Sequence, residues 1–298
     1  MMKIGICGTG LMGATMAQIF VEKGYETCIW GRTEASLERG RKIITLEADA
    51  PLRFTTQLED LKPCDIIIES IVEDLSVKQD FFERLSEIVD SETILATNTS
   101  GLSMNRICER VRGKERFLGM HWFNPSNLIP LTEIICNEKT KQRYVDAVYE
   151  LAKAIGKKPV ICRQDVPGFI ANRIQFAVLR ECMDIVEKGT ATIEDVDAVM
   201  KYGIGFRYAA YGPFEVADFG GLDTFYHISE YLNQDLCDAK EPQKMMKDLY
   251  IQGNYGVKSG RGFYDYSAGK GEEAVKIRNR KFKDMKECLD KWETYGRE

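Results

Sequence analysis

Short apolar runs alternate with helical periodicity along the first half of the chain. Residues 3–7 (KIGIC) predict a buried strand, and residues 11–23 carry Met12, Met16, Ile19 and Phe20 on one helical face. Strand-like runs recur at residues 26–30, 65–69, 93–97, 117–121, 132–136 and 159–162, with helical patterns between them. Because strands that alternate with helices pack as crossover units, the pattern predicts a parallel, doubly wound α/β sheet.

The pattern changes after Asp165, where helical periodicity continues and no clear strand follows. Residues 169–188 form one long helical pattern that Gly189 ends, and residues 192–200 form a second. Further helical segments reach about residue 252. We predict a domain boundary near residue 164, which gives an α/β domain over residues 1–164 and an all-α domain over residues 165–298.

The charged tail, residues 272–292, has the pattern of an amphipathic helix. Its single apolar stripe has 3-4-3 spacing and consists of Phe282, Met285, Leu289 and Trp292.

Composition restricts the class of protein. With 44% hydrophobic and 29% charged residues and a formal net charge of −5, the chain resembles a soluble globular protein. No basic block favours a nucleic-acid or membrane partner, and no apolar stretch approaches the roughly 20 residues that span a bilayer. The nine scattered cysteines form no CxxC pair, so neither a disulfide framework nor a zinc or other metal site is supported. Because the chain opens directly into a strand, we expect no signal peptide and a cytoplasmic location.

The stretch GTGLMG follows the first strand and opens the first helix, which is the context that a dinucleotide-binding motif requires. Gly8 permits the tight turn, Gly10 lets the backbone approach a pyrophosphate, and Gly13 lets helix and strand pack closely. The helix N-terminus offers unpaired N–H groups to the phosphates. The first domain is therefore predicted to be a Rossmann-type domain that binds NAD or NADP.

The end of the second strand lacks the acid that usually accepts the ribose hydroxyls of NAD. In ETCIWGRT, Gly31 occupies that position, Arg32 follows, and Thr33 can add a hydroxyl contact. A 2′-phosphate is repelled by a carboxylate but suits an arginine and an open backbone. The sequence favours NADP over NAD; in the alternative interpretation Arg32 is a solvated residue at a helix start.

His121 is one of only two histidines and stands in FLGMHWFNPSN, at the end of an apolar run. Taken alone, it reads as a core histidine with a satisfied ring. A proline-bearing loop can return the next strand so that Glu133 lies beside it, where a carboxylate orients an imidazole and stabilises its charged form. Ser100 in TNTSGLS follows a strand end, and Asn172 starts a long helix. We expect a cleft between the domains to bring these segments together.

These residues carry a resemblance over nearly the whole chain. The stretches GTGLMG, ESIVEDLSVKQ, LATNTSGLS, GMHWFNP, PVICRQDVPGFIANR, GPFEVADFGGLD and GVKSGRGFYDY are similar to the 3-hydroxyacyl-CoA dehydrogenase family, in particular its 3-hydroxybutyryl-CoA dehydrogenase-like members. The resemblance implies that His121 takes the proton of the substrate hydroxyl while hydride passes to nicotinamide, and that Glu133 holds the ring. Ser100 and Asn172 would hydrogen-bond the reacting oxygen or carbonyl.

The resemblance also implies a cofactor site and a homodimer formed through the helical domain. In that dimer the apolar stripe of the tail would extend the buried surface or cover the partner. The predicted cofactor site consists of Gly8, Gly10, Leu11, Met12, Gly13, Gly31, Arg32, Thr33, Glu73, Lys78, Asn98, Ser100 and Lys258.

Two departures from the family concern the substrate. The family usually has a long helical hairpin between the second and third strands that helps hold the CoA nucleotide, but here residues 33–54 number only 22. Arg207, Tyr208 and Ala209 stand where the CoA enzymes have a shorter Pro-Met run, and this stretch looks like gulonate 3-dehydrogenase (lambda-crystallin) and carnitine dehydrogenase. Arg207 would clamp a carboxylate there, or is a surface or structural arginine.

The sequence thus predicts an oxidoreductase that interconverts a 3-hydroxy and a 3-oxo compound, with Ser100, Asn172 and Arg207 binding the substrate. The family favours a CoA thioester, whereas the departures favour a free acid. The 6-phosphogluconate and 3-hydroxyisobutyrate dehydrogenases are a rival class, but they resemble one another in a lysine on the interdomain helix, and residues 169–188 have no lysine before the last position. A non-catalytic, crystallin-like dinucleotide-binding protein is the other alternative.

Overall fold

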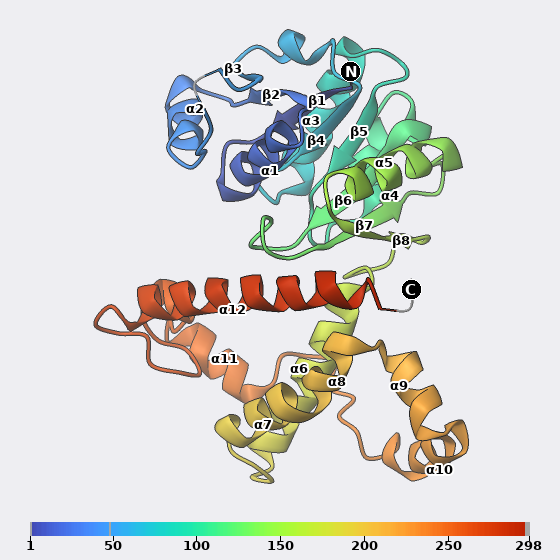
Figure 1. Ribbon diagram of the computed structural model, residues 1–298, viewed down its shortest axis with the longest axis vertical. Helices are drawn as coiled ribbons and strands as arrows, with labels where there is room; N and C mark the ends of the chain where they lie inside the picture. The colour runs from blue at the N-terminus through green and yellow to red at the C-terminus, as the bar shows by residue number, and fades with distance from the viewer. Residues whose placement is uncertain (1, 48, 296–298) are drawn as a thin grey trace. The chain divides into compact units, whose positions relative to one another are not determined.

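The protein, seen in a computed structural model that describes residues 2–47 and 49–295, folds as two compact units, Met1–Arg173 and Ile174–Glu298. The first unit is built on one eight-stranded sheet with the order β3-β2-β1-β4-β5-β6-β7-β8 (Figure 1). The strands are β1 (Lys3–Cys7), β2 (Glu26–Trp30), β3 (Leu52–Thr55), β4 (Ile66–Glu69), β5 (Ile94–Thr97), β6 (Phe117–Trp122), β7 (Leu131–Cys136) and β8 (Lys158–Cys162).

The sheet is doubly wound as predicted and mostly parallel, with one antiparallel pair. Strands β1 to β6 run parallel, but β7 runs antiparallel to β6, and β8 is parallel to β7. The connection between β6 and β7 spans only residues 123–130. Because a parallel crossover needs a dozen or more residues, this connection can only form a return hairpin.

Strand β3 was not among the predicted strands. It has four residues, pairs only with β2 at the edge of the sheet, and includes the exposed Arg53. A short edge strand of this kind has too little apolar alternation to stand out in sequence.

Helices cover both faces of the sheet and form two apolar layers. On one face, α1 (Leu11–Glu22) and α5 (Gln142–Ala154) pack on inward residues such as Ile6 and Ile68. On the other face, α3 (Leu75–Ile88) and α4 (Met104–Ile107), with the 3₁₀ turns η1 (Leu58–Leu61) and η2 (Cys108–Arg110), pack on residues such as Ile67 and Leu95. Burial on both faces explains why the central strands are nearly continuous apolar runs.

The connection between β2 and β3 carries one helix, α2 (Glu34–Arg41), of eight residues. Thr33 caps this helix by accepting the Ser36 N–H at 3.2 Å. Residues 42–47 and 49–51 form turns and irregular chain before β3.

The second unit consists of helices, with no named strand among its described residues up to Tyr295. The predicted long helix is α6 (Ala171–Glu187), and the predicted tail helix is α12 (Lys270–Trp292). The predicted helix at residues 192–200 ends earlier, because α7 (Ile193–Val199) passes into a π-helix, η4 (Met200–Ile204). The other helices are α8 (Gly205–Ala210), α9 (Pro213–Gly220), α10 (Leu222–Leu232) and α11 (Lys244–Ile251).

None of the helices within residues 2–47 and 49–295 combines the length and apolar character that crossing a bilayer requires. All nine cysteines are free thiols.

Candidate active site

The glycine loop lies at the carboxyl end of β1, where the strand order reverses and ligands bind in sheets of this type. Gly8 has a φ of 124°, and a Cβ there would lie 2.3 Å from the Ser70 carbonyl oxygen. A Cβ on Gly13 would lie 2.1 Å from the Gly8 carbonyl oxygen, whereas one on Gly10 would meet nothing within 4 Å. The loop is therefore tight where strand and helix meet and open at Gly10, where the uncapped start of α1 can receive a pyrophosphate.

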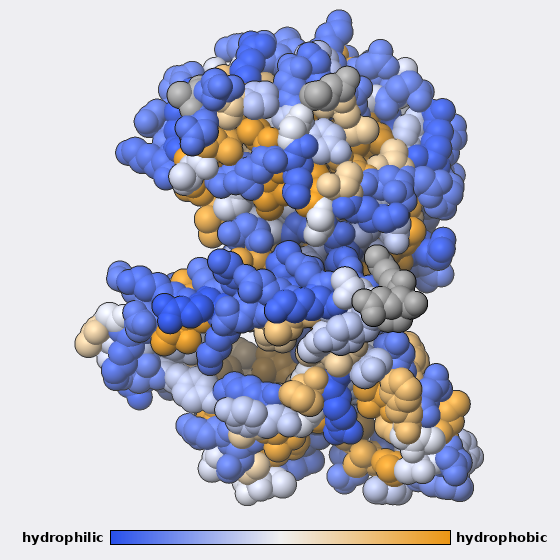
Figure 2. Space-filling model, viewed as in Figure 1, coloured by the Kyte–Doolittle hydropathy of each residue, from blue (hydrophilic) through white to orange (hydrophobic). Residues whose placement is uncertain are grey.

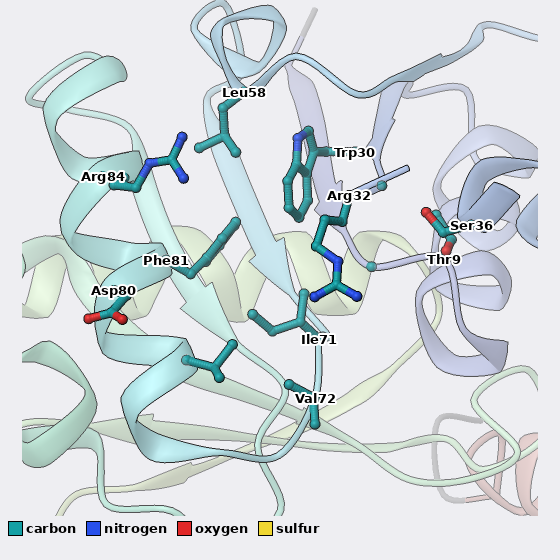
Figure 3. A pocket seen from close by; sticks show the side chains of 13 residues that line it. Thr9, Trp30, Arg32, Ser36, Leu58, Ile71, Val72, Asp80, Phe81 and Arg84 are labelled. Carbon is teal, nitrogen blue, oxygen red and sulfur yellow. The ribbon is translucent and has the colours of Figure 1, made fainter. Parts of the chain in front are cut away.

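A cavity of about 450 Å³ continues from this loop along the end of β2 and the flank of α3. Figure 3 shows the Arg32 side chain extending into it beside Trp30 and toward Ile71, with Phe81 and Arg84 projecting from α3. The apolar and aromatic lining suits a flat adenine ring, and the two guanidinium groups suit phosphate oxygens. Arg84, Trp30 and Phe81 were not predicted as lining residues, because their side chains converge here only once α3 packs beside β2.

Gly31 is enclosed by neighbouring side chains. A Cβ at this position would lie 2.6 Å from Leu37 Cδ2, 2.7 Å from Ser36 Oγ and 2.9 Å from Thr9 Cγ2. A carboxylate here would displace these atoms. The structure thus gives a packing reason for the missing acid, in addition to the charge argument.

Lys78 and Glu69 form a buried ion pair at the carboxyl ends of β4 and β5. The Lys78 side chain is 1% exposed, and its Nζ lies 2.6 Å from Glu69 Oε1 and 3.3 Å from Glu73 Oε2. Glu69 also accepts the Thr97 hydroxyl and the Ile71 N–H, each at 2.6 Å. The predicted cofactor residue Lys78 is therefore paired with two acids, and Glu69 accepts two further hydrogen bonds. Glu69 was not predicted, although an acid that ends an apolar strand run was a signal for it.

Glu73 fixes the loop that carries Ser100. Its Oε1 accepts the Ser100 N–H at 3.0 Å and the hydroxyl of Thr99. On the other side of the loop, Asn172 Nδ2 donates to the Ser100 carbonyl oxygen at 2.9 Å. The structure thus brings together three predicted site residues that lie far apart in sequence.

Asn98 ties this loop to β6. Its Oδ1 accepts the Trp122 N–H at 2.8 Å, and its Nδ2 donates to Ser70 Oγ at 3.2 Å. Asn98 thereby joins the strand end beside the glycine loop to the residue that follows His121.

His121 and Glu133 face each other across the β6–β7 hairpin, where they are register partners. His121 Nδ1 lies 2.8 Å from Glu133 Oε2, and the side chains are 4% and 0% exposed. Within the described residues, His121 Nε2 makes no hydrogen bond. A histidine with one nitrogen held by a carboxylate and the other unoccupied has the arrangement of a general acid–base group rather than of a fully satisfied core histidine.

The other oxygen of Glu133 reaches the start of α6. Oε1 accepts the Ile170 N–H at 3.0 Å and the Ala171 N–H at 2.8 Å. Burial raises the pKa of Glu133, but the hydrogen bonds from His121, Ala171 and Ile170 and the charge of His121 outweigh it and hold this pKa below its usual value. The carboxylate therefore stays ionised and can offset the charge of a protonated imidazole.

The hairpin loop between the two residues is anchored from both sides. Ser126 Oγ lies 2.5 Å from Thr15 Oγ1 on α1. Lys157 Nζ donates to the Ile129 carbonyl oxygen at 2.7 Å and also to that of Ser126. These contacts tie the loop to the helix that starts at the glycine motif.

Two predicted site residues lie in the second unit. Arg207 is exposed on α8, and no described residue forms an ion pair or side-chain hydrogen bond with it. Lys258 stands in the turn η5 (Val257–Ser259), with Nζ 5.2 Å from the centre of the Tyr255 ring. The roles predicted for both residues stay predictions.

A nucleotide loop beside a histidine–carboxylate pair defines a dinucleotide-dependent oxidoreductase. The family description "3-hydroxyacyl-CoA dehydrogenase, NAD binding domain" matches residues 3–51 and 45–166, and "3-hydroxyacyl-CoA dehydrogenase, C-terminal domain" matches residues 168–266. The chain belongs to the 3-hydroxyacyl-CoA dehydrogenase family of NAD-binding oxidoreductases, which confirms the resemblance seen in its motifs.

Two relatives in this family are named for different substrates. The 5-formyl-3-hydroxy-2-methylpyridine 4-carboxylate 5-dehydrogenase of Mesorhizobium japonicum is 32% identical over 96% of this chain and 98% of its own length. A probable 3-hydroxybutyryl-CoA dehydrogenase of Deinococcus radiodurans is 36% identical over 89% of this chain and 100% of its own.

Two solved structures match this chain with different TM-scores. The structure of a 5-formyl-3-hydroxy-2-methylpyridine 4-carboxylic acid 5-dehydrogenase, described as an NAD⁺-dependent dismutase, matches with a TM-score of 0.90 and 32% identity, covering 97% of this chain and 99% of that one. A 3-hydroxyacyl-CoA dehydrogenase from Archaeoglobus fulgidus matches with a TM-score of 0.73 and 35% identity, covering 94% and 97%. The two structures have similar sequence identity to this chain, and the first has the higher TM-score.

Proposed function

We propose that this chain is an NAD(P)-dependent dehydrogenase that interconverts a hydroxyl and a carbonyl group on a small free carboxylic acid rather than on a CoA thioester. The observation that carries the proposal is the short β2–β3 connection with its eight-residue α2, in place of the helical hairpin that helps hold the CoA nucleotide in the family. The relative with the TM-score of 0.90 is named for a free pyridine carboxylic acid, which supports the same substrate class.

In this proposal His121 is the general acid–base group. Its free Nε2 takes the proton of the substrate hydroxyl during oxidation and returns it to the carbonyl oxygen during reduction. Glu133 holds Nδ1 and balances the positive charge of the ring. Ser100 and Asn172 hydrogen-bond the reacting oxygen. The glycine loop and the cavity beside it would hold the dinucleotide, whose nicotinamide would supply the hydride chemistry.

We propose NADP as the preferred cofactor. The fold accepts either dinucleotide, but the enclosed Gly31 leaves no acid to repel a 2′-phosphate, and Arg32 extends into the cavity. Arg84 supplies a second guanidinium at its far side. The NAD⁺ dependence named for the dismutase relative is the competing outcome.

We propose that Arg207, the only arginine of α8, binds the carboxylate of the substrate. Arg207→Met should raise KM for a free oxo acid strongly, because charge-assisted hydrogen bonds contribute about 1.5–3 kcal/mol. An unchanged KM would remove Arg207 from the site and leave the rest of the proposal in place.

The second unit supports the proposed homodimer. Among its described residues only Met183 and Gly271 are buried, and aromatic side chains such as Phe214 and Phe219 are 86% and 73% exposed. Figure 2 shows apolar residues on the surface over α9 and α10. A surface this apolar is typical of an obligate interface, and a second copy of the chain supplies a matching surface. The cytoplasm is the compartment we propose, in keeping with nine free thiols.

The experiment is a panel of free oxo acids, free aldehyde acids and matched CoA thioesters, each assayed with NADPH and NADH. We expect at least about tenfold higher kcat/KM for a free acid than for its thioester. A thioester preferred over every free acid would contradict the substrate class. Lack of turnover on all substrates would favour the non-catalytic alternative.

A second candidate reaction is dismutation of an aldehyde acid, favoured by the whole-length match to the dismutase. The aldehyde hydrate would lose hydride and a proton to give the carboxylic acid, and the reduced cofactor would return the hydride to a second aldehyde with a proton to give the alcohol. His121 handles the proton in both halves. Equal amounts of acid and alcohol, formed with catalytic NAD(P)⁺, would identify this reaction.

A further inference from the structure

The segment that leads into α6 contains an unusual backbone conformation. Phe169 has a φ of 53°, and among the described residues only Ala268 shares a positive φ without being glycine. Gly168 before it has a φ of 78°, so two consecutive residues are left-handed. The left-handed region is disfavoured for bulky side chains, so the surrounding structure must hold Phe169 in it.

The turn closes on itself and directs two N–H groups to one acceptor. The Phe169 N–H donates to the Val166 carbonyl oxygen at 3.0 Å. The N–H groups of the next two residues, Ile170 and Ala171, both donate to Glu133 Oε1. Successive N–H groups that converge in this way form a concave site for an anion, and here the anion is the carboxylate that holds His121.

The Phe169 ring is buried against the same histidine. Phe169 is only 1% exposed. The centre of its ring lies 5.8 Å from the centre of the His121 ring, and the two ring planes meet at 63°. Phe123 packs on His121 as well, at 4.5 Å between ring centres. The imidazole is therefore fixed by a carboxylate at Nδ1 and by aromatic rings beside it.

We propose that Phe169 is a positioning residue for the reaction: its buried ring holds the left-handed turn, and the turn holds Glu133 on His121. Glycine would adopt the same φ more easily but has no ring to lock the turn. Leucine or methionine would fill part of the space but would not keep both the left-handed turn and the aromatic contact.

The groups around Glu133 determine what a change at Phe169 should do. Glu133 is held by His121 from β6 and by the two N–H groups from α6. From β8 it faces the Cys162 thiol, whose pKa is raised by burial and also by the charge of Glu133, so this thiol is neutral near pH 7. When the turn relaxes, the carboxylate is free to move and no longer holds the imidazole in place. The pH profile of the rate should then differ from that of the wild type.

The test compares Phe169→Leu with Phe82→Leu. Phe82 is also fully buried but lies in the core beside Phe117, with ring centres 4.9 Å apart. Both variants lose similar volume. We expect Phe169→Leu to lower kcat by about 10- to 100-fold, as small misplacements of catalytic groups do, and to change the pH profile of kcat/KM while cofactor Kd is unchanged. Phe82→Leu should lose stability and keep the wild-type profile. Superimposable profiles for Phe169→Leu and wild type would overturn the proposal.

A second readout does not depend on turnover. The chain has two histidines, so a ¹⁵N-histidine spectrum of a His227→Asn variant reports the His121 ring alone. We expect Phe169→Leu, or Phe169→Met if the former does not fold, to change the chemical shifts of the ring nitrogens. Unchanged spectra would also overturn the proposal. The inference rests on the proposed role of His121, but the two fail differently: inactive wild-type protein contradicts the function, whereas active variants with wild-type profiles contradict only the positioning role.

Discussion

The two units of the molecule differ in which side chains they bury. The first unit buries charged groups such as Lys78, Glu69 and Glu133 and gives each of them partners. The second unit leaves most of its large apolar side chains exposed, and among its described residues only two are buried. Buried charges are costly unless paired, and exposed aromatic surface is costly unless covered.

The difference indicates where each unit obtains its stability. The first unit completes its own core on both faces of the sheet and can therefore hold a rigid polar site. The second unit has few buried residues of its own, so we infer that association supplies the burial it lacks. The site chemistry should then depend on single residues of the first unit, and stability of the second unit on protein concentration.

The largest effect is expected from breaking the buried ion pair between Lys78 and Glu69 in the first unit. Glu69→Gln leaves Lys78 buried beside the partly exposed Glu73 alone, and removing one partner of a buried pair costs about 3–5 kcal/mol of unfolding free energy. The double variant Glu69→Gln, Lys78→Met should recover much of that loss, because no buried charge is left unpaired. Denaturant unfolding measures the free energy of unfolding of the single and the double variant. The pair between the exposed Arg53 and the partly buried Asp60 is the control, and Arg53→Ala should cost less than about 1 kcal/mol. Equal costs for Glu69→Gln and Arg53→Ala would contradict the contrast between buried and exposed pairs.

The next effect tests the second unit. Phe214→Glu places a charge on the exposed apolar surface of α9, and interface residues of this kind contribute about 2 kcal/mol or more when they lie at the centre of a contact. We expect a dimer Kd raised at least about tenfold, measured by sedimentation velocity over a range of concentrations. Val160→Glu on the exposed face of β8 is the control and should leave the dimer intact. A wild-type protein that is monomeric at micromolar concentration would remove the dimer altogether.

A smaller effect concerns the cofactor. Arg32→Ala should weaken NADPH more than NADH, by roughly 5- to 150-fold in relative kcat/KM, which corresponds to about 1–3 kcal/mol. Arg84→Ala should act in the same direction and more weakly, since it projects from α3 rather than following β2. Introducing Asp at Gly31 is a less direct test, because its Cβ would collide with three side chains. A wild-type protein with equal or better kcat/KM for NADH would show that NADP is not preferred.

The smallest effect is a pH dependence of stability. Because the folded state holds the pKa of Glu133 below its usual value of 4.5, its contribution is present above that pH and is lost as pH falls through the lower folded value. The difference in unfolding free energy between wild type and Glu133→Gln should therefore shrink as pH drops below about 4.5. A difference that stays constant or grows toward acid would contradict the ionised state of Glu133.

Much of the fold and the central pair could be predicted from sequence. Buried strands appear as apolar runs, and a short proline-bearing loop between two of them places Glu133 beside His121. The edge strand β3 lacks such a run. Glu69 and Phe169 were missed because their roles arise from tertiary contacts: a carboxylate that meets a lysine nine residues later, and a phenylalanine held at a positive φ. Residue type alone does not reveal either contact.

The central claim is that His121, held by Glu133, transfers the proton. The most direct measurement is kcat of the His121→Gln variant on the best substrate, with cofactor binding measured on the same preparation. We expect kcat to fall by at least about 100-fold, within the range for general acid–base groups, while the cofactor Kd stays within about twofold of wild type. A His121→Gln variant that retains near wild-type kcat on the best substrate would contradict the account.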